Sequence, residues 1–351
     1  MNQYNKRIQN IPQSLWSLIN QVDELKGRWV GGATLNPQAL GRLKRSVLVT
    51  STGASTRIEG SKLSDEDIEN MMRGLSMQKF ADRDTQEVQG YYELLENVFS
   101  ASAKIPLSES TIKHLHRELL KYVEKDTLHR GEYKKGENKV EMIDGTGKSI
   151  GILFDTTPAW LTPKEMQELV EWTQEAIALQ KIHPLLVIAN FLVEFLNIHP
   201  FQDGNGRLSR ILTNLLLLQA GYIYMPYVSH EKLIEDNKAD YYLALRKSQK
   251  TLKTDMPNIT PWLEFFLNIV LTQSKQAIEL LSKENIEKLL SPKQLAVWQY
   301  LETVSEATPG DTAKQTGVAR PTVSQAIDTL LRLKKIERIG QGRTTRYRKV
   351  Q

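Results

Sequence analysis

Apolar residues recur at helical spacing along most of the chain, and this pattern predicts a mainly α-helical protein. Two segments, 184–198 and 211–226, are apolar almost throughout, with polar interruptions such as Asn190 and Glu194. Both fall short of the roughly 20 uninterrupted apolar residues that cross a bilayer, so we interpret them as buried core helices. Further helices are expected near 12–26, 37–55, 64–77, 84–103, 109–125, 162–181, 206–220, 239–252 and 260–287.

Proline and capping residues predict where some of these helices begin and end. Thr162 is expected to cap one helix, with Glu165 closing a capping box. Pro184 is expected to open the next helix, because its missing amide hydrogen is not needed in the first turn. The His199-Pro200 pair is expected to close it, since proline disfavours helix in the residue before it.

One stretch, residues 137–155, departs from the helical pattern. Two β-prone runs, Lys139–Ile143 and Ser149–Phe154, flank the turn-forming sequence Asp144-Gly145-Thr146-Gly147, which predicts a hairpin. A hairpin in a helical domain is either a surface excursion or a flap whose open strand edge pairs with an extended peptide. The pattern leaves both readings open.

Residues 291–351 are predicted to form a separate small domain that begins at Ser291-Pro292. Helices at 292–305, 310–316 and 320–334 precede a basic, alternating stretch that predicts a two-stranded wing. This order resembles a winged helix-turn-helix, with the last helix as the recognition helix. The alternative is a protein-interaction or dimerisation domain with a basic face. The side chains expected to contact DNA are Arg320, Thr322, Ser324, Gln325, Arg343 and Arg346.

Charge supports an anionic partner for the C-terminal segment alone. The chain of 351 residues has a net charge of +5, but residues 320–351 carry nine basic and only two acidic residues. The chain has no cysteine, which excludes disulfides, a thiolate nucleophile and cysteine-ligated zinc. The N-terminus lacks the apolar segment of a signal peptide, and we expect a cytoplasmic protein that does not bind membranes.

The feature that carries chemistry is the segment HPFQDGNGRLSR at residues 199–210. Gly204 and Gly206 permit a left-handed backbone, and their amides, at the start of a new helix, form an anion-binding nest. Arg207 and Arg210 are three residues apart in the first turn, so they lie near one face and could clamp a polyphosphate. The segment therefore predicts a phosphate site.

The same segment supplies a base and a metal ligand. Asp203 is a hard oxygen ligand, suited to Mg²⁺ held between one carboxylate and substrate phosphates. His199 can accept a proton near neutral pH. The alternative is a polar helix–helix loop with a histidine cap.

These twelve residues match the signature HPFx(D/E)GNGRxxR at every defining position, so the sequence resembles the Fic (Fido) family over roughly residues 40–275. The resemblance implies an all-α domain with a small β-hairpin flap. It also implies transfer of AMP from ATP, with Mg²⁺, to a Ser, Thr or Tyr hydroxyl of a target protein or of the enzyme itself.

The resemblance assigns roles by motif position. His199 is the general base, Asp203 holds Mg²⁺, Phe201 anchors the loop in the core, and the 137–155 hairpin aligns the target segment. Gln249 stands where the family often has an asparagine that contacts adenine. The implied nucleotide-binding residues are Gly204, Asn205, Gly206, Arg207, Leu208, Ser209, Arg210, Tyr241 and Tyr242.

Upstream, residues 55–60 read STRIEG and match the (S/T)xxxE(G/N) inhibitory motif of Fic proteins. The resemblance implies that Glu59 pairs with Arg210 and blocks the γ-phosphate position, that Ser55 fixes the inhibitory helix, and that Gly60 completes the motif. Read without the resemblance, Glu59 and Gly60 would be an ordinary helix end.

We expect three parts: an N-terminal helical segment with the inhibitory helix (1–60), a Fic catalytic domain (61–287) and a winged helix-turn-helix domain (288–351). A homodimer is compatible with the family. Two other functions remain open: a DNA-binding regulator whose Fic module senses nucleotide, and a Fic enzyme that transfers UMP, GMP or phosphocholine. His116 is expected to have no catalytic role, and Trp160 is expected in the core.

Overall fold

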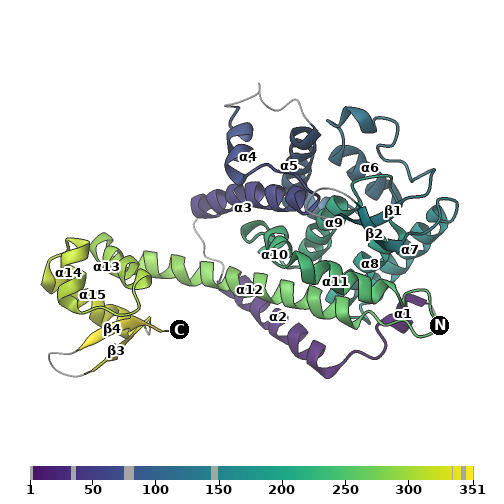
Figure 1. Cartoon of the computed structure of the whole chain (residues 1–351). Helices are drawn as coiled ribbons and strands as arrows, with labels where there is room; N and C mark the ends of the chain where they lie inside the picture. The colour runs from purple at the N-terminus through teal and green to yellow at the C-terminus, as the bar shows by residue number, and fades with distance from the viewer. Residues whose placement is uncertain are drawn as a thin grey trace. The chain divides into compact units, whose positions relative to one another are not determined.

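The structure is a computed structural model that describes residues 3–32, 37–74, 83–143, 149–333, 335–340 and 345–350. The fold is mainly α, as predicted (Figure 1). The α-helices are α1 (Gln3–Arg7), α2 (Gln13–Gly32), α3 (Pro37–Ile58), α4 (Asp65–Met72), α5 (Arg83–Ala101), α6 (Glu109–Leu119), α7 (Thr162–Leu179), α8 (Pro184–Ile198), α9 (Asn205–Gln219), α10 (His230–Asp236), α11 (Lys238–Gln249), α12 (Thr260–Leu289), α13 (Pro292–Thr303), α14 (Pro309–Thr316) and α15 (Arg320–Arg332). The strands are β1 (Lys139–Ile143), β2 (Ser149–Asp155), β3 (Ile336–Ile339) and β4 (Arg346–Lys349), and short 3₁₀ helices lie at Ser102–Lys104, Glu124–Asp126 and Met225–Tyr227.

The chain forms two compact units, residues 1–278 and 279–351, and the division falls within α12. No helix in the described part of the chain is long and apolar enough to cross a membrane.

Helix α8 is the core of the first unit. Every residue from Leu185 to Ile198 is buried, and α8 packs against α7 and α9. The polar residues inside this apolar helix are explained by α1, a helix that the hydrophobic pattern did not predict. Glu194 forms a buried ion pair with Arg7 at 2.6 Å, and the amide of Asn190 donates to the Tyr4 carbonyl at 2.9 Å. Paired in this way, these groups can be buried at low cost.

The predicted hairpin is present. Strands β1 and β2 pair antiparallel, with register shifts after Val140 and after Met142. The predicted turn, residues 144–147, lies outside the described residues. The loop 199–204 leads from α8 directly into α9. Asn138, the residue before β1, donates to the carbonyls of His199 and Phe201 in this loop, so the base of the hairpin contacts the end of α8.

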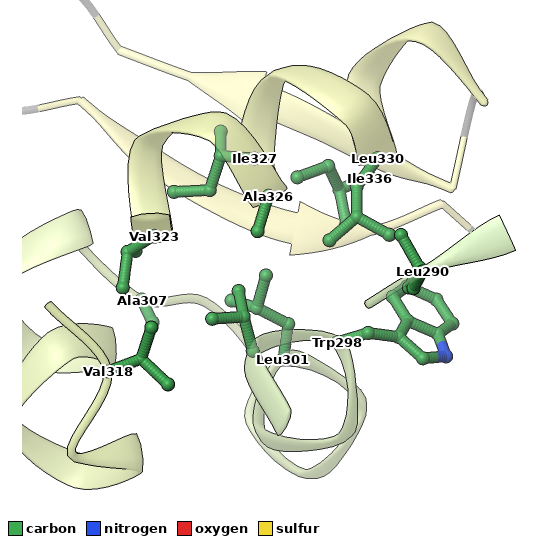
Figure 2. Close-up of a cluster of buried hydrophobic side chains, with 11 residues drawn as sticks. Leu290, Trp298, Leu301, Ala307, Val318, Val323, Ala326, Ile327, Leu330 and Ile336 are labelled. Atoms are coloured by element: carbon green, nitrogen blue, oxygen red, sulfur yellow. The ribbon is translucent and has the colours of Figure 1, made fainter. Parts of the chain in front are cut away.

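The second unit has its own apolar core, built mainly from α13, α15 and β3, with Ala307 and Val318 from the segments on either side of α14 (Figure 2). Helix α13 begins at Ser291-Pro292, as the sequence predicted, and Ser291 also caps it through a capping box with Gln294. Trp298 and Leu301 of α13 face Ala326 and Leu330 of α15 across this core. The three helices are followed by the antiparallel pair β3–β4, which is the expected order of elements.

Several local predictions were wrong. Thr162 does not cap α7: its hydroxyl donates to the Pro158 carbonyl, and the carboxylate of Glu165 accepts from Thr157 rather than closing a capping box. Trp160 is 79% exposed rather than in the core. Helix α6 ends at Leu119, earlier than expected, and α10 lies in a stretch where no helix was predicted.

Candidate active site

The turn between α8 and α9 holds the chemistry-bearing segment in an unusual backbone conformation. His199 ends α8 in the left-handed region, with φ 52° and ψ 60°, and Gly204 has φ 79°. A non-glycine residue in this region costs roughly 1–3 kcal/mol unless its surroundings hold it. The side chain of Asn205 closes the turn, because it accepts from the Phe201 amide at 2.9 Å and donates to the Phe201 carbonyl at 2.8 Å. Phe201 is fully buried, consistent with an anchor.

The two arginines of the segment are both buried on α9 but have different partners. Arg207 pairs with Glu87 of α5 at 2.6 Å and with Asp203 at 3.0 Å. Arg210 instead faces α3 and the residue that follows it: its guanidinium donates to the Ser55 hydroxyl at 2.7 Å, to the Ser55 carbonyl at 2.9 Å and to Glu59 at 2.6 Å. The structure therefore brings Ser55, Glu59 and Arg210 together.

Gly206 makes room for this contact. A Cβ at position 206 would lie 2.2 Å from a carboxylate oxygen of Glu59 and 3.5 Å from Arg210. Glu59 thus lies directly over the start of α9, where the helix amides are exposed to an anion. Gly60 follows in the left-handed region with φ 106°, a conformation that glycine adopts without strain.

The electrostatics of the pair keep both groups charged. Burial acts to raise the pKa of Glu59, but Arg210 and then Arg207 outweigh it, so the pKa lies below its ordinary value. Burial acts to lower the pKa of Arg210, but the Glu59 carboxylate acts to raise it, and the pKa of Arg210 lies above its ordinary value. Glu59 is consequently a carboxylate at neutral pH.

Asp203 is half-buried beside three donors. Its carboxylate pairs with Arg83 at 2.6 Å and with Arg207 at 3.0 Å, and it accepts from the Gly204 amide at 2.6 Å. Burial opposes ionisation, but Arg207 and these other donors lower the pKa of Asp203. In the described part of the chain no three acidic or histidine side chains gather at one point, so a cation here would rest on one carboxylate and on its ligand's own oxygens.

His199 is held in its neutral form. Burial lowers the pKa of its imidazole to about 4, and the nearby Lys134 acts in the same direction, whereas Glu59 and Asp203 act against it. The Nδ1 atom lies 3.4 Å from the Leu196 carbonyl. A neutral imidazole at pH 7 can accept a proton.

Tyr241 and Tyr242 lie next to the arginine end of the site. Tyr241 is buried among Trp262 and Phe265, with ring centroids 5.9 and 5.7 Å away, and its pKa is raised by burial, with Arg210 acting to lower it. Tyr242 is half-buried at the edge of this cluster. Gln249 is buried on the same helix, and neither atom of its side-chain amide has a hydrogen-bond partner among the described residues.

His116 is a residue of this site that the sequence reasoning missed. Its ring is fully buried and stacks on Phe201 with centroids 3.8 Å apart. Nδ1 accepts from the Gly131 amide at 2.9 Å, so the proton is on Nε2, which lies 3.0 Å from the Asp203 carbonyl and donates to it. The ring thus fixes the peptide of Asp203. Its spacing from His114 on α6 excluded a shared metal site but gave no sign of this loop contact.

The residues predicted to contact DNA lie on α15 and β4, except Arg343, which lies outside the described residues. Arg320, Ser324 and Gln325 are exposed on α15, and Thr322 is half-buried. Arg346 is exposed on β4 but pairs with Glu306 at 2.8 Å.

Together these features define a helical domain built around a glycine-rich turn with two buried arginines. Residues 106–217 match the Fic/DOC family model, so the chain contains a Fic/DOC domain. This finding confirms the domain that the signature indicated.

The chain is similar to proteins named as adenylyltransferases. It is 24% identical over 216 residues to a probable protein adenylyltransferase of Aquifex aeolicus, and the matched region covers 59% of this chain and 64% of that protein. It is 32% identical over 121 residues to the protein adenylyltransferase Fic of Drosophila virilis, which covers 34% of this chain and 22% of that protein. The chain thus spans less than two thirds of either relative.

The crystal structure of a Fic family protein from Desulfovibrio desulfuricans has the same fold. It is similar with a TM-score of 0.62 and 24% sequence identity, and the match covers 97% of each chain.

Proposed function

We propose that the protein transfers AMP from ATP to a hydroxyl side chain of a target protein. The observation that carries this proposal is the turn 199–210, where a neutral histidine, a carboxylate and two buried arginines surround the start of α9. The names of the relatives support the same activity. The orphaned amide of buried Gln249 supports a base-binding position near Tyr241 and Tyr242, because an amide can pair with the edge of adenine.

In the proposed reaction the target hydroxyl oxygen attacks the α-phosphorus of ATP. The bond from that phosphorus to the bridging oxygen breaks, pyrophosphate leaves, and the hydroxyl proton goes to His199. The glycine-rich turn binds the phosphates through its amides, and Arg207 adds charge. Arg210 binds the γ-phosphate once Glu59 has moved. Leu208 and Ser209 belong to the first turn of α9, where they support this cradle.

The site fits Mg²⁺. Asp203 supplies one hard oxygen beside the phosphate cradle, and its carboxylate stays ionised. When bound, Mg²⁺ would neutralise phosphate charge. Arg83 pairs with the same carboxylate, so it has to move aside for the metal.

The ion pair between Glu59 and Arg210 supports autoinhibition. It removes the cation that the γ-phosphate needs and places a carboxylate over Gly206. Ser55 adds two further contacts that hold Arg210 against α3. Residues 1–60 would then form the inhibitory segment of a catalytic domain that extends to about residue 287. The hairpin β1–β2 would align the target segment through its free edge.

The activity is tested by incubating Glu59→Gly with ATP and Mg²⁺ and measuring its intact mass. We expect the mass of one or more AMP groups, and no added mass in Glu59→Gly combined with His199→Ala. GTP, UTP and CDP-choline in place of ATP test the other donors. Added mass from one of these, with none from ATP, would contradict the proposal.

A second candidate function is DNA binding by residues 288–351. The exposed Arg320, Ser324 and Gln325 on the third helix of a three-helix unit followed by a two-stranded sheet support it. The protein would then couple nucleotide transfer or nucleotide sensing to a DNA site.

A further inference from the structure

Lys134 is a buried ammonium that the proposed reaction does not use. It is 4% exposed, and none of the ion pairs found in the described part of the chain includes it. Its three donors reach three neutral oxygens: Asn138 Oδ1 at 2.7 Å, Thr156 Oγ1 at 2.9 Å and the Ile198 carbonyl at 3.0 Å. Burying an ammonium group without a carboxylate partner costs free energy, so we expect a buried lysine of this kind to have a structural or functional role.

The partners of Lys134 lie on two structures that the reaction needs together. Ile198 is the last residue of α8, next to the general base. Asn138 immediately precedes β1 and Thr156 immediately follows β2, so both lie at the base of the hairpin. Thr156 also donates to the Asn138 carbonyl at 2.8 Å, which ties the two ends of the hairpin to each other.

The same short segment holds the four consecutive carbonyls of residues 198–201, where α8 ends and the turn begins. The Lys134 amide donates to the Pro200 carbonyl at 2.9 Å, and its ammonium donates to that of Ile198. The Asn138 amide donates to the carbonyls of His199 at 3.3 Å and Phe201 at 2.8 Å. Four consecutive carbonyls, 198–201, are thus held by two side chains and one backbone amide.

We infer that Lys134, with Asn138, is a positioning residue for the transfer reaction. It holds His199 in its left-handed conformation and fixes the base of the hairpin to that turn, so that the general base and the strand edge that receives the target keep one geometry. This inference rests on the proposed function. Lys134 makes no contact with ATP in this role, so we expect the affinity for ATP to be the same with and without the lysine.

The test uses the full chain with Glu59→Gly as the active parent. Lys134→Met removes the three hydrogen bonds and keeps most of the side chain's volume. Lys135→Met is the matched control, because Lys135 is the next residue and is exposed. Asn138→Ala is the second variant, which leaves the buried ammonium in place and removes the contacts to His199 and Phe201.

For Lys134→Met we expect kcat for AMP transfer to fall at least about tenfold, because small displacements of a reacting group can cost up to 10²-fold. The KM and Kd for ATP should stay within about twofold, since the phosphate cradle is untouched. Asn138→Ala should show a smaller loss of kcat with the same unchanged ATP affinity, and Lys135→Met should match the parent. Hydrogen exchange of the peptide covering 198–205 should speed up in the first two variants only.

The inference is overturned if Lys134→Met and Asn138→Ala keep the parent's kcat, or if ATP affinity falls in step with kcat, which would indicate general loss of structure. If Lys134→Met does not fold, the kcat and ATP affinity of Asn138→Ala alone test the inference. A parent that transfers no AMP contradicts the proposed function instead. The exchange measurement then still decides whether Lys134 holds the turn, because it needs no activity.

Discussion

At the scale of single residues, two arginines one helical turn apart do different work. Arg207 pairs with Glu87 of α5 and with Asp203 of the turn, whereas Arg210 is turned toward Ser55 and Glu59. Their spacing predicted one shared face, and the two side chains diverge because acidic partners stand on opposite sides. Of the two, only Arg210 is paired with Glu59, so the proposed inhibition acts through Arg210.

The pKa of His199 predicts how activity depends on pH. A general base works in its neutral form, and the pKa of about 4 keeps the imidazole neutral above that pH. In Glu59→Gly this pKa should fall further, because the Glu59 carboxylate acts to raise it. We therefore expect kcat/KM for AMP transfer by Glu59→Gly to fall on the acid side with a midpoint at or below about pH 4. An acid limb centred near the ordinary histidine value, about 6.5, would contradict this assignment.

His116 yields a prediction about stability. His116→Phe keeps the ring against Phe201 but leaves the Gly131 amide and the Asp203 carbonyl without their partner. Each unpaired buried group costs about 1–3 kcal/mol, so the free energy of unfolding in urea should fall by about 2–6 kcal/mol. His114→Phe is the control, because His114 is exposed on the same helix, and it should change stability little. Equal losses in the two variants would show that the loop contacts do not matter.

The sequence could predict the residues within 199–210 because they are contiguous and their types agree with one task. It could not predict His116, Lys134 or Asn138, because their contacts with the turn join positions more than 60 residues apart. No spacing along the chain marks such a contact, and a buried histidine or lysine has the same letter as an exposed one. The pairing of Glu59 with Arg210 was an exception only because a family motif pointed to it.

At the scale of elements, α3 is fastened by more than the Glu59 pair. Arg57 donates to Glu235 of α10 at 2.6 Å and to Asp65 of α4 at 2.9 Å. Gly53 makes room for this arrangement, because a Cβ there would lie 2.5 Å from the Arg57 guanidinium. Helix α10, which the hydrophobic pattern did not predict, thus anchors the segment that carries Glu59.

Breaking this anchor should loosen inhibition in part. Arg57→Ala removes ion pairs with two other helices while leaving Glu59 intact, so we expect AMP transfer to rise about three- to tenfold over wild type, below the level of Glu59→Gly. Arg73→Ala serves as the control, since Arg73 pairs only with Glu69 of its own helix in an exposed position among the described contacts. A rate of AMP transfer in Arg57→Ala equal to that of wild type would show that Arg57 does not contribute to inhibition.

The spacing of apolar residues predicted the positions of most helices, but it predicted the ends of the helices less accurately. The starts of α8 at Pro184 and of α13 at Ser291-Pro292 were predicted because proline acts locally. Helix α7 also begins where it was expected, but the predicted cap is absent, because Thr162 and Glu165 have partners at Pro158, Thr157 and Lys253 instead. Tertiary contacts overrode a local signal there.

At the scale of the whole molecule, the basic C-terminal unit predicts a second binding activity. Arg320→Ala should weaken binding of duplex DNA about tenfold in an anisotropy titration of the full chain, whereas Arg332→Ala, at the other end of α15, should not. The affinity of wild type should also fall steeply as salt rises, because counterions are released from the phosphates. Binding that is absent at low salt, or equal in both variants, would favour the protein-interaction reading of this unit.

The central claim is that an enzyme able to transfer AMP is held inactive by the pair between Glu59 and Arg210. The most direct measurement is the initial rate of AMP incorporation from labelled ATP by wild type and by Glu59→Gly at equal concentration, under the same Mg²⁺ and pH. The account predicts a rate at least about tenfold higher in Glu59→Gly, equivalent to about 1.4 kcal/mol of relieved inhibition. Equal, measurable rates in the two proteins would contradict it.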